Sequence, residues 1–372
     1  MKIALFHPWI KSRGGAEKVV LEIAKSLEDV DIYTWVYDQD QTFEEFEKFK
    51  INVLSPNWAK IFSRGFLSRG IFFILSLFSK IPLEKYDYFF ISTSGVGEFI
   101  LFRNYKPKKT YSYVHTPLRF CTPNIIKWQK QNNSRGFALD SLYLFAIKTY
   151  NILEKIAWRR IDKAFFNSDL SKKRAIEKKL IKEGEIIYPL VDLDDFKKIR
   201  TKKGDYFLYV SRFNHPKRQD LLIEVWKDFV KTNPNKKLIL AGSAESKKYM
   251  KKIREMCKDQ KSIEIKENLN RENLLKLYAN CFAGIFIGFE EDFGIVPFEF
   301  LALGKTLIAV NQGGYVDLIK NLPQVIWVKE EKIKESLLKS LKIASKNKIK
   351  PKKIQLIDKE SFISSIRRIF KN

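Results

Sequence analysis

The feature that most constrains how this chain folds is a twofold alternation of short apolar runs with helical patterns. The first series has apolar runs at 3–6, 31–35, 88–91, 110–114 and 164–167, and the second has them at 206–210, 237–241, 262–265, 283–287, 306–309 and 324–327. Short apolar runs between amphipathic helices, such as the pattern at 16–27, are typical of parallel strands buried on both faces. The sequence therefore predicts an α/β protein with two domains and a cleft between them.

The domain boundaries follow from the polarity of the connecting segments. A polar stretch from Asp192 to Asp205 separates the two series. We expect an N-terminal domain over residues 1–192, a linker over 193–205 and a C-terminal domain over 206–350. The residues from Phe362 to Phe370 have the pattern of an amphipathic helix, so the segment 351–372 is expected to pack back toward the N-terminal domain.

The composition indicates a folded protein of a reducing compartment. Hydrophobic residues make up 45% of the 372 residues, which argues against a disordered chain. The three cysteines, Cys121, Cys257 and Cys281, lack the spacing of a metal site. The first residues turn polar too soon for a signal peptide, and the longest apolar stretch, 70–78, is far shorter than the roughly 20 residues of a spanning helix. We therefore expect a cytoplasmic protein.

The net charge of +26 leaves two interpretations open. Residues 1–190 carry 31 basic and 20 acidic side chains and residues 191–372 carry 38 and 23, so neither half concentrates the excess. Such a charge is either an ordinary solvated surface or an attraction to anionic lipid or another polyanion. The stretch 58–83 interleaves aromatic and basic residues, which suits an interfacial helix and equally a pair of core helices. An anionic membrane surface is thus a candidate partner, with the protein peripheral at the inner face.

Two carboxylates in the second series indicate a ligand site. Glu291 follows the apolar run 283–287, and Glu299 comes shortly after Pro297. Because the run 283–287 is a predicted strand, Glu291 is predicted in the loop after it. Because proline favours the first turn of a helix, Glu299 is predicted in the first turn of the next helix. Ligands of open α/β sheets bind at this edge, where free amides at 294–296 could receive a phosphate and a carboxylate could accept ribose hydroxyls.

Two cations precede these carboxylates in the same series. Arg212 follows the run 206–210, and Lys217 comes five residues later. Arginine binds a diphosphate in bidentate fashion, and lysine binds it as a point charge. Together with Glu291 and Glu299, this pair predicts a nucleotide site.

These motifs, with others, resemble the retaining glycosyltransferases of family 4, also called group 1, which have the GT-B fold of two Rossmann-like domains facing across a cleft. In the second half the matching residues are Ser211-Arg212, Lys217, Ala241-Gly242-Ser243, Glu291 to Gly294, Glu299 and Gly313-Gly314. In the first half they are Gly14-Gly15-Ala16-Glu17, Asn167-Ser168 and Ile187 to Asp192. The segment from Tyr113 to Arg119 is similar to the His-Thr-Pro-x-Arg segment of a branch that includes bacterial polysaccharide mannosyltransferases.

The resemblance implies a role for each matching residue. Arg212 and Lys217 would hold the donor diphosphate, Glu299 would bind the ribose hydroxyls, and Glu291 would bind hydroxyls of the transferred sugar. His115 would lie over the donor sugar, and Gly15 would let the N-terminal backbone approach the diphosphate. The implied donor-binding set is Gly14, Gly15, Arg212, Lys217, Gly242, Glu291, Phe293, Gly294, Ile295 and Glu299, and the implied catalytic set is His115, Glu291, Arg212 and Lys217.

The chain departs from the family pattern at three places. Arg218 stands where glycine usually follows the lysine, and Phe298 and Phe300 flank Glu299 where smaller aliphatic residues are common. After Arg119 the branch often has an aromatic and an acid, whereas this chain has Phe120-Cys121-Thr122. This last departure leaves the sugar and the acceptor open.

The remaining histidines and acids carry weaker signals. His7 fits a structural or a functional role, and His215 is expected in a surface loop, whereas the position of His115 before Thr-Pro favours function. Asp38 and Asp40 resemble a metal-binding pair of the other large glycosyltransferase fold, but they follow a strand of the first domain and are interpreted as loop acids. Neither a metal nor another cofactor is expected.

The sequence thus predicts a glycosyltransferase that moves a sugar, with mannose as the guess, from a nucleoside-diphosphate donor to a glycan or lipid-linked acceptor in polysaccharide or glycolipid synthesis. A GT-B epimerase or phosphorylase is the alternative among enzymes. A basic nucleic-acid-binding protein would explain the charge but neither Glu291 and Glu299 nor the glycine turns, so no nucleic-acid partner is expected.

Overall fold

The structure is a computed structural model that describes residues 1–56, 67–105, 109–117, 121–122, 126–127, 137–191, 193–202, 204–346, 354 and 358–371. It divides into two compact units: Met1–Leu190 with Ile357–Asn372, and Val191–Leu356. The segment 193–205, expected as a linker, belongs to the second unit and contains the short helix α6 (Asp194–Lys197). The predicted cleft between the domains stays a prediction.

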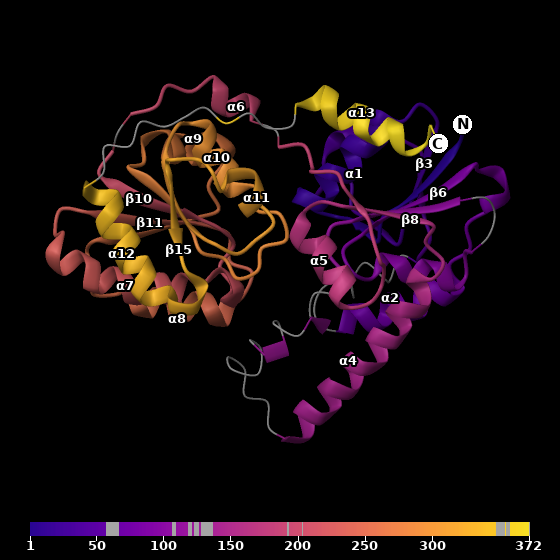
Figure 1. Cartoon of the computed structure of the whole chain (residues 1–372), viewed down its shortest axis with the longest axis horizontal. Helices are drawn as coiled ribbons and strands as arrows, with labels where there is room; N and C mark the ends of the chain where they lie inside the picture. Colours follow the sequence, from indigo (N-terminus) through magenta and orange to yellow (C-terminus); the bar gives the residue numbers. More distant parts are fainter. Residues whose placement is uncertain are drawn as a thin grey trace. The chain divides into compact units, whose positions relative to one another are not determined.

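The first unit contains a seven-stranded parallel sheet (Figure 1). Its order is β5-β3-β1-β6-β7-β8-β9, with β1 at Ile3–Phe6, β3 at Val30–Thr34, β5 at Ile51–Val53, β6 at Tyr88–Thr93, β7 at Lys109–Val114, β8 at Lys163–Phe166 and β9 at Glu185–Ile186. A separate parallel pair joins β2 (Trp9–Ile10) to β4 (Val36–Tyr37). The apolar runs of the first series are confirmed as strands, whereas β5 and β9 are too short to show a periodicity in the sequence.

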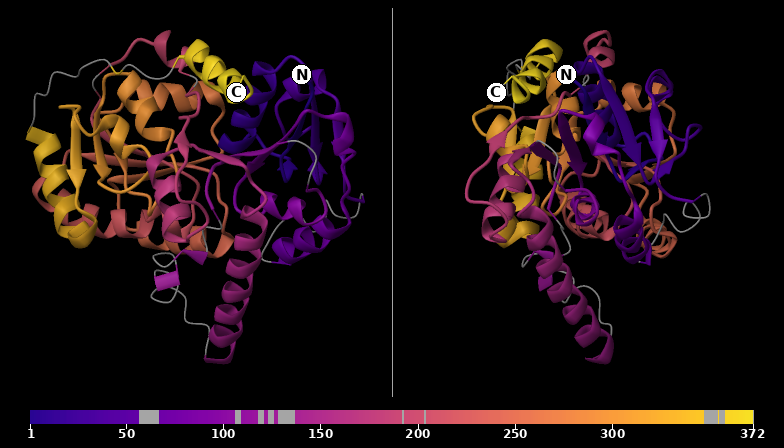
Figure 2. Two further views of the ribbon diagram at one scale, coloured as in Figure 1. Left: turned by 45° about the vertical axis from the view of Figure 1, so that its right-hand side comes forward. Right: turned by 90° about the vertical axis from the view of Figure 1, so that its right-hand side faces the viewer.

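Helices cover both faces of this sheet. Residues Ile3 and Leu5 of β1 face α1 (Gly15–Ser26) and α13 (Lys359–Ile369), and the alternate residues Ala4 and Phe6 face the other layer. That layer contains α2 (Leu67–Phe78), the 3-10 helix η4 (Gly97–Phe102) and α4 (Phe137–Trp158). In Figure 2 the long helix α4 lies on the side of the first unit opposite α13. The shorter elements are η1 (Glu44–Lys48), η3 (Leu83–Lys85) and α5 (Asp169–Glu177).

The C-terminal helix α13 is part of the first core although it is last in the sequence. Its residues Phe362, Ile366 and Ile369 are buried with the strands and α1. The ring of Phe370 lies 5.1 Å from that of Tyr88 and 5.2 Å from that of Phe90. The amphipathic pattern seen in the sequence therefore corresponds to a helix whose apolar side completes the core.

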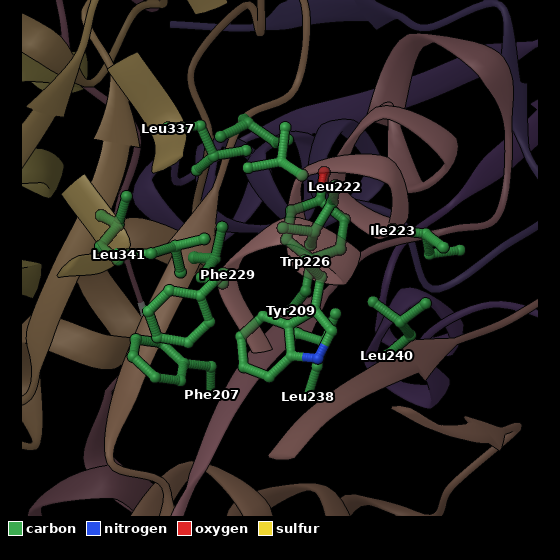
Figure 3. Close-up of a cluster of buried hydrophobic side chains, with 14 of the residues drawn as sticks. Phe207, Tyr209, Leu222, Ile223, Trp226, Phe229, Leu238, Leu240, Leu337 and Leu341 are labelled. Atoms are coloured by element: carbon green, nitrogen blue, oxygen red, sulfur yellow. The ribbon is translucent and has the colours of Figure 1, made fainter. Parts of the chain in front are cut away.

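The second unit contains a six-stranded parallel sheet in the order β12-β11-β10-β13-β14-β15. The strands are β10 (Tyr206–Val210), β11 (Lys237–Gly242), β12 (Ile263–Glu267), β13 (Ala283–Phe286), β14 (Thr306–Val310) and β15 (Val325–Val328). On one face lie α7 (Gln219–Thr232), α8 (Lys247–Cys257) and α12 (Ile333–Lys346), and on the other lie α9 (Arg271–Asn280) and α10 (Val296–Ala302), while α11 (Val316–Ile319) follows β14 (Figure 1). Figure 3 shows the core of the first of these faces, where Phe207, Trp226 and Phe229 meet Leu337 and Leu341.

Strand order decides where a ligand can bind in each unit. The order reverses between β1 and β6 in the first sheet and between β10 and β13 in the second. At such a reversal the loops after the two strands lead to helices on opposite faces, and doubly wound proteins bind their ligands there, at the carboxyl edge. The loops that follow β1, β6, β10 and β13 are therefore the places to look for a site.

Candidate functional site

Lys217 and Glu291 meet at the strand reversal of the second sheet. Lys217 ends the 3-10 helix η6 (His215–Lys217) after β10, and Glu291 lies in the loop after β13, as predicted. The Nζ of Lys217 donates a hydrogen bond to Oε2 of Glu291, and the two side chains are only 12% and 20% exposed. The structure thus brings together a cation and a carboxylate that are 74 residues apart.

Several contacts fix the loop that carries Lys217. The side chain of Asn214 caps η6 by accepting a hydrogen bond from the amide of Lys217 at 3.2 Å. The carbonyl of Lys217 accepts one from the hydroxyl of Tyr209 on β10. The amide of Phe289 donates to the carbonyl of Pro216 at 2.8 Å and so joins the two loops. The ammonium group therefore projects from an ordered turn.

Arg218, where the family usually has glycine, has a left-handed backbone with φ 58° and ψ 34°. Glycine adopts this conformation without strain, and other residues do so at a cost. The guanidinium donates to both carboxylate oxygens of Glu330, at 2.8 and 2.5 Å, and lies 4.7 Å from the ring centroid of Phe289. These side-chain contacts offset the backbone cost and explain how the arginine is accommodated.

Close packing around Tyr315 requires glycine at positions 294 and 313. Gly294 has φ 80°, and a Cβ atom at this position would lie 2.9 Å from the Tyr315 ring. Gly313 has φ 145° and packs against the same ring. The amide of Gly314 donates to the carbonyl of Glu291 at 2.9 Å. The predicted motifs at 291–294 and 313–314 therefore form one structural unit that sets the position of Glu291.

The aromatic residues beside Glu299 fill space on either side of α10. The ring of Phe298 stacks on that of Phe293 at 5.2 Å, and Phe300 packs on Tyr278 at 4.7 Å. Gly284 of β13 lies against Phe300, so a Cβ atom there would collide with its ring. Ile295, the residue before α10, is 37% exposed. Of the two bulky residues that depart from the family pattern, Phe300 is thus matched by the small residue Gly284 on β13.

Glu299 lies in the first turn of α10, as predicted, and has two partners from α9. The hydroxyl of Tyr278 donates to its Oε2, and Nη1 of Arg271 lies 3.7 Å from its Oε1. Burial raises the pKa of Glu299, while the contacts with Tyr278 and Arg271 oppose this rise. Sequence reasoning missed both partners, because Tyr278 has the pattern of a core residue and Arg271 that of a surface cation at a helix start.

Arg212 lies in the loop after β10, the loop that leads to Lys217, and Gly242 is the last residue of the neighbouring strand β11. The Nη1 of Arg212 is 3.3 Å from Oε2 of Glu245 in an ion pair whose side chains are 62% and 49% exposed. Gly242 ends β11 so close to the carbonyl of Ser211 that a Cβ atom would collide with it. Arg212 therefore pairs with a surface acid and not with Glu291, whereas Gly242 serves the close approach of two loops.

In the first unit, His7 and His115 are joined through Ser92 at the strand reversal. His7 follows β1, Ser92 belongs to β6, and His115 follows β7. The Nδ1 of His7 lies 3.0 Å from the carbonyl oxygen of Ser92 and 3.1 Å from its Oγ. The same Oγ lies 2.9 Å from Nε2 of His115. All three residues are buried.

The hydrogen bonds among His7, Ser92 and His115 indicate which ring nitrogen of each histidine carries a proton. A carbonyl oxygen only accepts, so Nδ1 of His7 carries a proton, and burial lowers the pKa of His7 to about 4, which keeps the ring neutral. The Ser92 hydroxyl then donates to Nε2 of His115, its remaining partner among the described residues. Neutral His115 consequently carries its proton on Nδ1. Sequence reasoning left His7 undecided and missed Ser92, whose only signal is its place at a strand end.

The glycine-rich turn begins α1. Gly14 is the N-cap residue, and a Cβ atom there would collide with the carboxylate of Glu17, which accepts a hydrogen bond from Ser12 Oγ at 2.6 Å. Gly15 is the exposed first residue of the helix. The predicted residues Arg119 and Asp192 lie outside the described residues.

The remaining sequence candidates are Asp38, Asp40 and His215. Asp38 is half-buried and Asp40 exposed in the loop after β4. Within the described ranges, no three His, Cys, Asp or Glu side chains come together as metal ligands. His215, expected at the surface, is instead half-buried, with its ring 4.4 Å from that of Tyr249.

Comparisons with known proteins bear on the family and the fold of the chain. Residues 191–359 match the family described as glycosyl transferases group 1. The alpha-1,3/1,6-mannosyltransferase ALG2 of Dictyostelium discoideum is 22% identical, over 86% of this chain and 84% of its own. ALG2 of Saccharomyces cerevisiae is 23% identical over 86% and 71%. The human GDP-Man:Man(3)GlcNAc(2)-PP-Dol alpha-1,2-mannosyltransferase is 23% identical over 100% of this chain and 87% of its own.

Solved structures share the fold of the whole chain. HepE of Anabaena, in complex with UDP and glucose, has a TM-score of 0.69 at 17% identity and covers 99% of both chains. WaaG, a glycosyltransferase involved in lipopolysaccharide biosynthesis, has a TM-score of 0.63 at 14% identity and covers 100% of both. The matched domain, the relatives that align over most of the chain and this shared fold agree with the resemblance seen in the sequence: residues 191–359 match group 1, and the chain is a glycosyltransferase with the GT-B fold.

Proposed function

We propose that this glycosyltransferase transfers mannose from a guanosine-diphosphate donor to a hydroxyl of a lipid-linked glycan, with retention of the anomeric configuration. The observation that carries the proposal is the Lys217–Glu291 pair at the strand reversal of the group 1 domain. It offers a cation to a diphosphate beside a carboxylate for sugar hydroxyls. The relatives support mannose, and the name of the human relative includes a glycan on PP-Dol.

In the proposed mechanism the acceptor attacks the face of the sugar from which the diphosphate leaves. The bond from the anomeric carbon to the diphosphate oxygen breaks, the bond to the acceptor oxygen forms, and the acceptor proton passes to the leaving diphosphate. Lys217, joined by Arg212 and backbone amides, stabilises the negative charge that develops on the leaving group. When the diphosphate binds Lys217, the ion pair between Lys217 and Glu291 breaks, and the carboxylate of Glu291 can then accept hydrogen bonds from sugar hydroxyls. No carboxylate needs to act as a nucleophile, as one does in retaining glycosidases.

Glu299 is proposed to accept the ribose hydroxyls, and His115 to bind the donor sugar. Tyr278 and Arg271 support this role of Glu299, because both favour its charged, hydrogen-bond-accepting form. We expect no metal requirement, since Lys217 and Arg212 supply positive charge at the diphosphate. Transfer should persist in excess chelator, whereas loss of activity with rescue by magnesium or manganese would point back to Asp38 and Asp40.

The protein is proposed to work peripherally at the cytoplasmic face of a membrane, where a lipid-linked acceptor lies. In the described parts of the chain, no helix combines the length and apolar character that crossing a bilayer demands.

The decisive experiment compares ligands by thermal shift and then tests transfer. A ligand present at 100 times its dissociation constant adds about 2.7 kcal/mol to the free energy of unfolding, so a thermal-shift screen of GDP-mannose, GDP, UDP-glucose and UDP comes first. We expect GDP and GDP-mannose to bind best, and mannose to reach a lipid-diphosphate-linked glycan as the α-anomer. Preference for the UDP ligands would refute the assigned donor. Tight binding of duplex nucleic acid without any nucleotide-sugar binding would refute the proposal as a whole.

A further inference from the structure

Helices α2 and α4 of the first unit carry seven exposed apolar side chains. Of the thirteen exposed large hydrophobic side chains among the described residues, seven lie on these two helices. They are Ile74, Leu77 and Phe78 on α2 and Leu144, Phe145, Ile152 and Ile156 on α4, a set termed the α2–α4 face. Phe78 is 78% exposed and Phe145 is 69% exposed. Exposed apolar side chains concentrated on two helices of one layer indicate an interaction surface, whereas single exposed residues do not.

The two helices belong to one layer of the unit. Phe73 of α2 packs on Phe99 of η4 with ring centroids 5.3 Å apart, and Tyr150 of α4 packs on the same ring at 6.1 Å. Both helices therefore turn their buried sides toward η4, and the exposed residues are on their outer sides. The N-terminal half of α4 projects beyond the body of the first unit in both views of Figure 2. It is accessible to a broad, flat partner.

The charges on α4 indicate the chemistry of that partner. Lys148 and Lys155 are exposed on the helix, and Arg159 is exposed just after its end. These cations alternate with Phe145 and Ile152 at spacings of three and four residues, so they share one side of the helix. Glu154, the helix's only acid with a described side chain, is fully buried and pairs with Lys178. The outer side of α4 is thus apolar and basic, which is the pattern of a helix that lies on an anionic membrane.

We propose that the α2–α4 face docks on an anionic lipid bilayer. Phe78, Phe145 and Ile152 enter the interface, while Lys148 and Lys155 contact the lipid headgroups. The helix lies on the membrane and does not cross it, in keeping with the charges along its side. Docking would hold the enzyme beside a lipid-linked acceptor. This role of the α2–α4 face rests on the proposed function, whereas the binding of the face to a bilayer does not.

Co-sedimentation with vesicles, without nucleotide sugar, tests the proposal. The wild-type protein should bind vesicles that contain phosphatidylglycerol and should not bind pure phosphatidylcholine, and binding should weaken with salt. Each basic residue near an anionic surface contributes about fivefold in affinity, so Lys148→Ser/Lys155→Ser should weaken binding about 25-fold. The matched control is Lys339→Ser/Lys342→Ser on α12, which removes the same charge from exposed positions of the second unit and should change binding less than twofold.

A second set of variants tests the apolar side chains: Phe145→Ser/Ile152→Ser changes the α2–α4 face, and Ile343→Ser on α12 is its control. The first variant should lose binding even at low salt, and the control should keep it. The proposal is overturned if the wild type ignores anionic vesicles at low salt, or if the control variants weaken binding as much as the α4 variants. Light scattering that finds a dimer dissociated by Phe145→Ser/Ile152→Ser would assign the face to a second copy instead. Calorimetry with GDP verifies that the variants are folded, and absence of GDP binding by the wild type would count against the proposed function alone.

Discussion

The side chains of Lys217 and Glu291 form an ion pair across the point where the strand order of the second sheet reverses. In this arrangement the carboxylate of Glu291 is paired with Lys217, the cation that binds the diphosphate in the proposed mechanism. Binding of the donor must therefore replace one anionic partner of Lys217 by another. The exchange couples recognition of the diphosphate to release of the group that is proposed to bind the sugar.

Substitutions at the two positions should have opposite effects on the free nucleoside diphosphate. Lys217→Ala should weaken its binding by about 1.5–3 kcal/mol, the usual contribution of a hydrogen bond to a charged group. Glu291→Ala should bind it at least as tightly as the wild type, because the competing carboxylate is gone, and should lose most transfer activity. Calorimetry with GDP and a transfer assay measure both effects. Lys334→Ala, which breaks an exposed pair with Glu224, is the control, and weaker GDP binding by Glu291→Ala would contradict the assignment.

The affinity for the nucleotide should depend on the ionisation of Glu299. Only the charged carboxylate accepts two ribose hydroxyls, so affinity should fall as the pH falls through the raised pKa of Glu299. The Tyr278 hydroxyl favours the charged form, so Tyr278→Phe should raise this pKa further and move the fall in affinity to higher pH. Glu299→Gln should bind weakly, without the same pH dependence. The test is the dissociation constant of GDP as a function of pH, and identical profiles for the wild type and Tyr278→Phe would refute this role of Tyr278.

Ser92 should act through the tautomer of His115. Ser92→Ala removes the hydroxyl that donates to Nε2 of His115, so the proton of the neutral ring is free to move to that nitrogen. We expect transfer to slow by about 10- to 100-fold, the cost of one lost hydrogen bond of about 1.4–2.8 kcal/mol, with the affinity for GDP unchanged. Ser112→Ala removes a buried hydroxyl of the neighbouring strand that donates to the carbonyl of Ile91, and it should keep activity. Nitrogen-15 shifts of His115 report the tautomer directly, and an unchanged spectrum in Ser92→Ala would exclude the mechanism.

Arg218 separates backbone strain from side-chain contacts. Arg218→Ala and Arg218→Gly both lose the two hydrogen bonds to Glu330 and the contact with Phe289. Only alanine keeps the cost of a left-handed backbone, which is about 1 kcal/mol relative to glycine. We therefore expect both variants to be less stable than the wild type, and the glycine variant to be more stable than the alanine variant by about 1 kcal/mol. Chemical denaturation measures the difference, and equal stability of the two variants would show that the strain is relieved by other means.

Much of the fold could be predicted from the sequence because its signals are local. The apolar runs of β1 and β10 coincide with the observed strands, since a parallel strand covered on both faces needs an uninterrupted apolar sequence. The positions of Glu291 after a strand and Glu299 in a first helical turn followed from the strand before them and from Pro297. The short strands β5 and β9 escaped prediction, because two or three residues show no period.

What the sequence determined by itself is therefore the set of elements and the kinds of residues at the ends of strands. It did not determine that the loops after β10 and β13 are neighbours, because strand order depends on how helices cover both faces of a sheet. Only the tertiary structure paired Lys217 with Glu291, joined His7 to His115 through Ser92, and gave Glu299 its partners on α9. It alone also showed which sides of α2 and α4 stay exposed, because burial depends on packing against η4 and not on local composition.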